Sequence, residues 1–389
     1  MAIKNDVTKK KIGIVGGGQL GKMMILEAKR LGFYVVTLDP SANCPSQSIS
    51  DELIVSPLNN AQAYFELAEK VDIITYEWEL IDSQVLELLN QKGHRIYPSV
   101  ASLKIIQNKF TQNQTLKNNN IPTPRFDEVT DVHMIKKFGA KENYGFPLIL
   151  KTTFGGYDGK GVAFIRDESE VQQAFESLGN GKIGLMVEEF IDFELEISVI
   201  ATRGIDGSRV IYPIAENSHK NSILDTTIAP ARISEKTKDN AIKIALDVME
   251  VFEGVGTFGI EMFVTKAGDI LVNEIAPRPH NSGHYTIEAC FANQFENHIR
   301  AITGLPLGSA DLISPAVMIN LLGDTTGEAV FTGIEEAYAN PYVHVHNYGK
   351  STVSVGRKMG HLTAIGTSVQ QALERALDAQ KIVKVLGKK

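Results

Sequence analysis

The sequence predicts a parallel α/β unit, then an α+β unit and a small C-terminal α+β domain. Three observations support this fold class. Apolar strands alternate with amphipathic helices between residues 11 and 97. Strands joined by short turns dominate the middle of the chain. The turn-rich segment GLPLGS at 304–309 precedes a last stretch of strands and a closing helix.

Composition limits the partners that this protein can have. Its 389 residues correspond to about two or three domains. With 46 acidic and 39 basic residues, the net charge is -7, which argues against nucleic acid or an anionic membrane surface as partner. Two cysteines, Cys44 and Cys290, are too few for a disulfide framework, and we see no apolar run of membrane-spanning length. We therefore expect a cytoplasmic protein that acts on small molecules.

The first unit reads as a Rossmann-like domain covering residues 1–110. A strand at 11–15 runs into GGGQLG, and apolar residues then recur at helical spacing up to residue 31. Strands at 34–38, 52–55, 72–76 and 94–97 follow, with helical stretches between most of them. This alternation predicts a parallel sheet covered on both faces.

In the second unit, short turns in place of helices join many of the predicted strands. A polar helix at 102–118 and the extended IPTPRF lead into strands at 146–152, 162–167, 184–190, 194–203 and 209–216. Residues 204–208 suit a hairpin connection. A helix at 235–252, a hairpin of TFGIEMFV and DILVNEI, and a helical run at 282–303 complete the unit. Strands at 316–322 and 343–347 belong to the last domain.

The glycines of GGGQLG match a dinucleotide-binding pattern. Gly16, Gly18 and Gly21 fit G-x-G-x-x-G between a strand and a helix, and Asp39 ends the next strand. A tight turn of purely structural purpose needs the same glycines, because they permit positive φ and close packing. Exposed helix amides would also suit another phosphorylated ligand. The motif alone leaves these three interpretations open.

A second glycine-rich segment, GGYDGKG at 155–161, lies between two predicted strands. Its backbone amides could approach a polyanion, with positive charge from Lys151 and Lys160. It does not match the P-loop signature. The alternative is a plain flexible hairpin.

Two glutamates are predicted to face each other across the hairpin of the second unit. If Ala267 and Gly268 form a two-residue turn, Glu261 lies directly opposite Glu274; an odd number of turn residues would shift the register. Like charges repel there unless a cation lies between them, and with Asn273 nearby the oxygen donors suit Mg²⁺ better than zinc. Two exposed glutamates on a solvated face are the alternative.

The segment APRPHNSGH follows directly after this pair. It supplies Arg278, His280, Asn281 and His284 in an extended, proline-fixed stretch. An arginine, a histidine and an amide suit the binding of a planar oxyanion and the movement of a proton. No H-E-x-x-H pattern supports a zinc site. A purely structural role is the alternative.

These motifs together resemble one family. GGGQLG, GGYDGKG, VEEF followed by Glu196, NEIAPRPHNSGH, YGK and GRKMGHL are similar to those of the N5-carboxyaminoimidazole ribonucleotide synthetases of the ATP-grasp superfamily, over residues 11–365. The resemblance implies an ATP-grasp domain at 111–309, with a lid subdomain around 123–187, and a C-terminal domain at 310–389. It also implies a homodimer that carboxylates 5-aminoimidazole ribonucleotide with ATP and bicarbonate, through carboxyphosphate, in purine biosynthesis.

The resemblance also assigns roles to residues. Magnesium, or manganese in its place, would bind Glu261 and Glu274. Arg278, His280, Asn281 and Asp158 would act in catalysis, with either His280 or Asp158 as proton acceptor. The ribonucleotide would contact Gln19, Leu20, Glu77, Tyr157, Asp158, Lys350 and Arg357. ATP would contact Lys109, Lys151, Gly156, Tyr157, Asp158, Gly159, Lys160, Gly161, Glu188, Glu189, Phe190, Ile191, Glu196, His219, Asn273 and Glu274.

Position 109 carries lysine where some members of the family carry arginine, which keeps the charge and loses bidentate geometry. Three other activities compete with this one. A different ATP-grasp ligase would use another carboxylic acid and acceptor. An NAD-dependent oxidoreductase would rest on GGGQLG and Asp39 alone. A nucleotide sensor would bind ATP without turnover.

Overall fold

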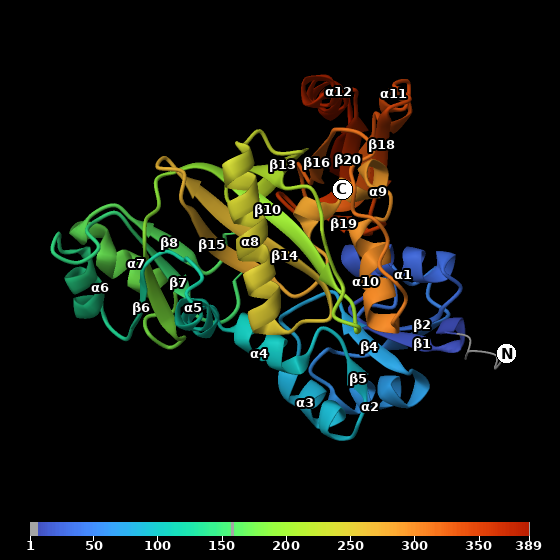
Figure 1. The fold of residues 1–389 in the computed structure, drawn as a ribbon, viewed down its shortest axis with the longest axis horizontal. Coiled ribbons are helices and arrows are strands. Elements are labelled where there is room, and N and C mark those ends of the chain that lie inside the picture. Colours follow the sequence, from blue (N-terminus) through green and yellow to red (C-terminus); the bar gives the residue numbers. More distant parts are fainter. Residues whose placement is uncertain (1–6, 157–158, 389) are drawn as a thin grey trace.

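A computed structural model describes residues 7–156 and 159–388. Its N-terminal unit is a five-stranded parallel sheet with strand order β3-β2-β1-β4-β5 (Figure 1), which confirms the predicted parallel architecture. After the short 3-10 helix η1 (Val7–Lys9), the elements are β1 (Lys11–Val15), α1 (Gln19–Arg30), β2 (Tyr34–Asp39), β3 (Glu52–Val55), α2 (Ala61–Lys70), β4 (Ile73–Tyr76), α3 (Ser83–Gln91) and β5 (Arg95–Ile96).

Each face of this sheet has its own core, as a parallel sheet requires. Helices α2 and α3 cover one face through Tyr64, Leu67 and Leu86, among others. Helix α1 covers the other face together with α10 (Gln294–Thr303), which contributes Phe295 and Ile299. Helix α10 comes from the far end of the second unit, so it ties the two units together.

The centre of the molecule is a nine-stranded antiparallel sheet. Its order is β15-β14-β10-β12-β13-β16-β20-β18, with β11 paired to β10. The sheet continues across residue 310, because β13 pairs with β16, so the predicted third domain shares this sheet with the second. The strands are β10 (Phe193–Arg203), β11 (Arg209–Ile211), β12 (Ala215–Lys220), β13 (Ile223–Ala229), β14 (Gly256–Thr265), β15 (Ile270–Ala276), β16 (Ala316–Leu322), β18 (Val343–Asn347) and β20 (Lys358–Ile365).

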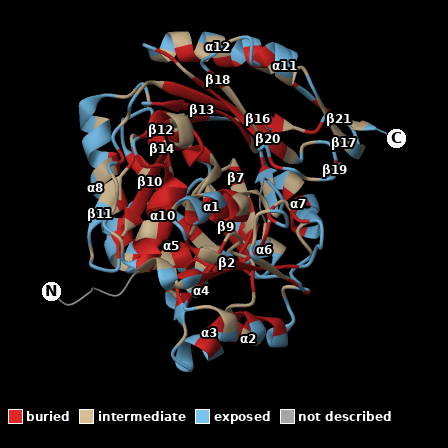
Figure 2. Ribbon diagram, turned by 90° about the vertical axis from the view of Figure 1, so that its right-hand side faces the viewer, coloured by how far each residue is buried: buried red, intermediate tan, exposed pale blue. Residues whose placement is uncertain are grey.

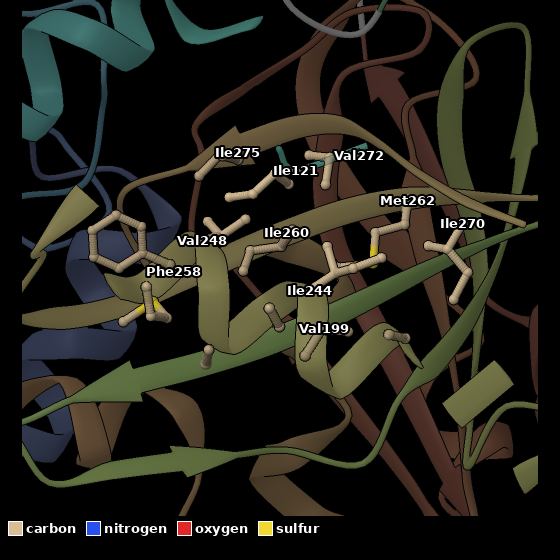
Figure 3. Close-up of a cluster of buried hydrophobic side chains, with 14 of the residues drawn as sticks. Ile121, Val199, Ile244, Val248, Phe258, Ile260, Met262, Ile270, Val272 and Ile275 are labelled. Atoms are coloured by element: carbon tan, nitrogen blue, oxygen red, sulfur yellow. The ribbon is translucent and has the colours of Figure 1, made fainter. Parts of the chain in front are cut away.

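The largest apolar cluster holds α8 (Glu235–Phe252) against this sheet. Ile244 and Val248 of α8 pack with Ile260 of β14 and with Val272 and Ile275 of β15 (Figure 3). Ser234 caps the helix by accepting a hydrogen bond from the Thr237 amide, so the predicted helix begins and ends at the residues expected. This packing fixes the strand pair that carries Glu261 and Glu274.

A smaller four-stranded sheet, in the order β6-β9-β7-β8, lies within the segment predicted as a lid. It has a separate core in which Leu148, Leu150 and Val187 meet Ile135 and Phe175. Its elements are β6 (Phe126–Val129), α6 (Val132–Gly139), β7 (Leu148–Thr152), β8 (Val162–Ile165), η2 (Glu168–Glu170), α7 (Val171–Ser177) and β9 (Leu185–Glu189).

The C-terminal part adds a three-stranded sheet, β19-β17-β21, and covers the central sheet with the closing helix. Buried strands lie beneath this partly exposed helix, α12 (Figure 2). The elements are β17 (Gly327–Thr332), α11 (Ile334–Ala337), β19 (Thr352–Val353), α12 (Val369–Ile382) and β21 (Lys384–Lys388). None of the helices in the described part of the chain combines the length and apolarity needed to cross a bilayer.

Three predicted elements are wrong in detail. The helix expected at 102–118 is two helices, α4 (Val100–Gln107) and α5 (Lys109–Asn118), because Asn108 is extended and caps α5. The strand expected at 209–216 divides into β11 and β12 around Pro213, which cannot donate to the ladder. The helix expected at 282–303 is η3 (Asn281–Gly283), α9 (Thr286–Ala289) and α10, with Asn293 capping α10.

Candidate active site

A cavity of about 1320 Å³ lies between the four-stranded sheet, the central sheet and the carboxyl ends of β1 and β4. Most residues that the sequence singled out line it. Gly156 and Gly161 are outside its lining, and Tyr157 and Asp158 lie outside the described residues. The lining contains Gln19, Leu20, Glu77, Lys109, Lys151, Gly159, Lys160, Glu188, Glu189, Phe190, Ile191, Glu196, His219, Glu261, Asn273, Glu274, Arg278, His280, Asn281, Lys350 and Arg357.

The second glycine-rich segment borders this cavity at the end of β7. The Thr152 amide donates to the Gly161 carbonyl at 2.9 Å. Gly161 has a φ of +75°, and a Cβ there would lie 2.6 Å from the Thr152 hydroxyl. The conformation therefore requires glycine. Gly159 and Lys160 line the cavity, which supports the polyanion interpretation over a plain hairpin.

Two lysines reach the same acidic region from different elements. Lys109 is the first residue of α5, and its Nζ lies 2.7 Å from Glu274 Oε1. Burial alone lowers the pKa of Lys109, but Glu274, together with Glu188 and Glu79, outweighs this effect and raises the pKa, so the ammonium stays charged. From β7, the Lys151 Nζ lies 2.5 Å from Glu188 Oε2 and 3.5 Å from Asn273 Oδ1. The helix break at Asn108, which the sequence did not predict, places Lys109 at this point.

Glu261 and Glu274 are cross-strand partners, as predicted, but the turn and the register that produce this pairing differ from those predicted. The turn has three residues instead of two, since the Thr265 amide donates to the Asp269 carbonyl at 2.8 Å. That turn shifts the register by one residue. A β-bulge at Asn273 shifts it back, so the two differences cancel at Glu261.

The bulge also brings two polar neighbours to one side of the strand. Asn273 and Glu274 both line the cavity, although consecutive strand residues normally face opposite ways. The residues that flank them, Val272 and Ile275, both lie in the largest apolar cluster. The extra residue thus gives the cavity an amide oxygen beside two carboxylates.

The environment gives the two glutamates different proton affinities. Burial raises the pKa of Glu261 to about 7, and the neighbouring Glu274 adds to this rise. Burial acts on Glu274 in the same direction, but Lys109 and Lys151 outweigh it and lower the pKa of Glu274 to about 2. At neutral pH Glu274 is therefore charged, while Glu261, which faces it, is partly protonated.

This donor set fits magnesium. Within residues 7–156 and 159–388, no group of three or more His, Cys, Asp or Glu residues is placed so that it could hold a metal ion. Magnesium commonly takes one or two carboxylates and completes its shell with phosphate oxygens and water. Glu261 and Glu274, with the Asn273 amide beside them, are oxygen donors of that kind, and all three line the cavity.

Arg278 and His280 extend from the end of β15 into the cavity. The Arg278 Nε lies 2.5 Å from Glu79 Oε2, and its Nη2 lies 2.8 Å from Glu79 Oε1. Burial, together with Arg278 and Lys358, lowers the pKa of His280 to about 3. The imidazole is therefore neutral at pH 7, and the same shift makes it a weak base.

Glu79 and Lys358, which also lines the cavity, were not predicted as site residues. Glu79 stands in the acidic segment EWE directly after β4, and Lys358 follows Arg357 in GRKMGHL. In a parallel sheet, residues just past the carboxyl end of a strand commonly form sites, so this position was a usable signal for Glu79.

The first glycine-rich loop does not present a free phosphate site. The Glu77 carboxylate accepts hydrogen bonds from the amides of Gly18 and Gly21, the second at 2.6 Å. Asp39 accepts from the Gly17 amide at 2.7 Å. The amides that a pyrophosphate would use are occupied by carboxylates of the protein, which argues against a dinucleotide site. The loop instead positions Glu77 at the cavity.

The remaining predicted residues line two further regions. His219 Nδ1 lies 2.6 Å from Glu196 Oε2, on neighbouring strands β12 and β10. At the C-terminal side, Lys350 Nζ donates to the Lys358 carbonyl at 2.7 Å, and Arg357 Nη1 donates to the Thr352 carbonyl at 2.7 Å. Lys350, Arg357 and Lys358 together make this end of the cavity cationic.

Comparison with known proteins identifies the family. Residues 9–107 match the ribonucleotide synthetase preATP-grasp domain, residues 114–295 the ATP-grasp domain, and residues 316–375 the phosphoribosylaminoimidazole carboxylase C-terminal domain. The N5-carboxyaminoimidazole ribonucleotide synthases of Staphylococcus aureus and Bacillus subtilis are each 40% identical to this chain. The matches cover 92% and 90% of it, and 94% and 90% of the relatives.

Solved structures give the same result. The N5-carboxyaminoimidazole ribonucleotide synthetase from Thermotoga maritima is 47% identical, with a TM-score of 0.89, over 97% of this chain and 100% of that one. The synthase from Aspergillus clavatus, solved with ADP and 5-aminoimidazole ribonucleotide, is 32% identical, with a TM-score of 0.89, over 97% and 99%. The chain therefore belongs to the N5-carboxyaminoimidazole ribonucleotide synthase family of ATP-grasp proteins.

Proposed function

We propose that this protein is a carbon–nitrogen ligase that carboxylates 5-aminoimidazole ribonucleotide with bicarbonate and ATP, giving N5-carboxyaminoimidazole ribonucleotide, ADP and phosphate. This reaction belongs to purine biosynthesis. One observation carries the proposal: a single cavity joins a paired-carboxylate site between two lysines, an Arg-His-Asn segment and a cationic end. The complex of the Aspergillus clavatus synthase with ADP and the ribonucleotide supports it.

The triphosphate would lie between β7, α5 and the β14–β15 hairpin. Lys109 and Lys151 would contact its phosphates, and the glycine-rich segment at 155–161 would cover them. Glu188 to Ile191 would offer backbone groups to adenine, and Glu196 would hold the ribose hydroxyls. Glu261 and Glu274 would hold Mg²⁺, or Mn²⁺ in its place. When bound, the ion would neutralise charge on the phosphate oxygens.

Bicarbonate would bind at Arg278, His280 and Asn281. Bicarbonate is a poor electrophile, because attack on its carbon must expel hydroxide. Transfer of the γ-phosphoryl group of ATP to a bicarbonate oxygen releases ADP and gives carboxyphosphate, whose leaving group is phosphate. The two lysines stabilise the charge that spreads over the transferring group.

The ribonucleotide would occupy the other end of the cavity. Lys350 and Arg357 would bind its phosphate, while Gln19, Leu20 and Glu77 would contact the rest of the molecule. Its exocyclic amine attacks the activated carboxyl carbon, the bond to phosphate breaks, and the amine loses a proton. The neutral imidazole of His280 is one candidate acceptor, and Asp158, outside the described residues, is the other.

Release of ADP tests this function directly. We expect release to require bicarbonate and to increase when 5-aminoimidazole ribonucleotide is added. Release with another carboxylic acid in place of bicarbonate would indicate a different ATP-grasp ligase, and ATP binding without release would indicate a nucleotide sensor. We further propose a homodimer, on the family resemblance; light scattering of the purified protein measures it.

A further inference from the structure

A buried amide from the central sheet contacts Asn281. Asn320 of β16 is 4% exposed, and its Nδ2 donates to Asn281 Oδ1 at 2.8 Å. In return, Asn281 Nδ2 donates to Asn320 Oδ1 at 3.0 Å. Asn320 Nδ2 also donates to the Leu224 carbonyl of β13, at 2.8 Å. The two side chains thus form a cyclic amide pair anchored to the backbone of the neighbouring strand.

The hydrogen bond from Asn320 to the Leu224 carbonyl fixes the orientation of both side-chain amides. A backbone carbonyl only accepts hydrogen bonds, so Leu224 requires the Asn320 NH₂ group on its side. The Asn320 NH₂ and oxygen then fix the Asn281 amide in the complementary orientation. The pair uses one N–H and one oxygen lone pair of Asn281. Its second N–H is therefore directed away from Asn320, and Asn281 lines the cavity.

We propose that Asn320 is a positioning residue for the bicarbonate subsite, which presents an Asn281 N–H toward the anion. The inference rests on the proposed function for the identity of that anion. Asn281 opens the short helix η3, whose backbone hydrogen bonds do not set the orientation of its side-chain amide, whereas Asn320 lies inside the nine-stranded sheet. The rigid sheet, through Leu224 and Asn320, thereby sets an amide that the loop alone would leave free to rotate.

Asn320→Asp tests the proposal, because it keeps the shape and replaces the donor NH₂ with an oxygen. That oxygen would face the Leu224 carbonyl and Asn281 Oδ1, so Asn281 must turn its amide. We expect the KM for bicarbonate to rise by about tenfold or more, as expected for loss of a hydrogen bond to a charged group, and the KM for ATP to stay within about twofold. Equal rises in both would overturn the proposal. Asn90→Asp, the same change at an exposed position, is the matched control.

A double-mutant comparison separates positioning from a merely structural role. Asn281→Ala, Asn320→Ala and the double variant are compared by their KM for bicarbonate, and thermal melting shows whether each is folded. If Asn320 acts through Asn281, the double variant matches Asn281→Ala alone. Additive effects of the two changes would contradict the proposal.

A measurement without turnover keeps this inference distinct from the proposed function. The side-chain amide protons of Asn281 and Asn320 are followed by ¹⁵N-edited NMR of the full chain. We expect slow exchange for the paired protons in the native protein and faster exchange for those of Asn281 in Asn320→Asp. Unchanged exchange of Asn281 would refute the positioning role, even if carboxylation proceeds as proposed. Lack of bicarbonate-dependent ADP release in the native protein would refute the function alone.

Discussion

The carboxylate of Glu79 accepts two hydrogen bonds from the guanidinium of Arg278, at 2.5 and 2.8 Å. Glu79 follows β4 of the parallel sheet and Arg278 follows β15 of the central sheet, so one ion pair connects the two units at the cavity. Both side chains are largely buried, and the pair fixes the plane of the guanidinium.

Glu79→Gln is therefore expected to impair the use of bicarbonate. The guanidinium keeps its charge but loses its anionic partner, so we expect kcat/KM for bicarbonate to fall by about ten- to a hundredfold, as when the partner that orients a site residue is removed. Glu87→Gln, which breaks the more exposed pair with Lys104, should leave it unchanged. A normal bicarbonate dependence in Glu79→Gln would show that Arg278 needs no such support.

Glu274→Gln should remove most ATP turnover. The substitution keeps the shape but leaves a divalent cation one anionic ligand short and deprives Lys109 of its partner. We expect a fall of about a hundredfold or more in ADP release, with a higher Mg²⁺ concentration needed for half-maximal rate. Glu69→Gln, at an exposed position of α2, is the control. Near-normal turnover at moderate magnesium would be the contrary result.

The stabilising effect of His219 should weaken as pH rises. Burial lowers the pKa of His219, but the hydrogen bond with Glu196 and the negative charges of Glu261 and Glu196 together outweigh burial, so the folded pKa lies above the unfolded value of about 6.5. A raised folded pKa contributes stability below the unfolded pKa, and the contribution is lost as pH rises through the folded value. Urea denaturation should therefore show a larger difference between native protein and His219→Gln at about pH 6 than at about pH 9. A difference that grows with pH would contradict the assignment.

Arg357→Ala should affect the ribonucleotide far more than ATP. Arg357 lines the cationic end of the cavity, and its loss removes a charge from the proposed phosphate site. We expect the KM for the ribonucleotide to rise by about tenfold or more, with little change for ATP. Arg375→Ala removes another backbone-bonded arginine, outside the cavity lining, and should alter stability without altering either KM. Equal effects of Arg357→Ala on both substrates would show that this region is structural.

Local patterns in the sequence were sufficient to predict much of this fold. Amphipathic helical stretches separate most strands of the parallel sheet, and the helix Glu235–Phe252 has both a capping residue, Ser234, and a periodic apolar face. The helix break at Asn108 escaped prediction because residues 102–118 have no glycine or proline to mark it. The pairing of β13 with β16 escaped as well, because residues 223–229 were not predicted as a strand and strands this far apart in sequence leave no local sign of their contact.

The site residues also divide into those with a local sequence signal and those that depend on contacts between distant parts of the chain. Motif residues such as Lys151, Glu274 and His280 line one cavity, as their chemistry suggested. Asn320 was missed because its role depends on Asn281, 39 residues away in the chain. Glu79 had a signal in its position just past β4, but its partner Arg278 lies 199 residues away. Side chains that support a site are seldom distinguishable by residue type, since their role depends on what the fold places beside them.

In a regular strand, adding or removing one residue changes both the side chains that face a site and those that pack in the core. The β-bulge at Asn273 separates these two effects. Glu261 faces Glu274 and Ile260 faces Ile275 on one side of the bulge, while Met262 faces Val272 on the other. A ladder without Asn273 would keep all three of these pairs. Loss of the single residue Asn273 would therefore remove an amide from the cavity without repacking the interior, which gives evolution or a designer an independent adjustment of the proposed metal site.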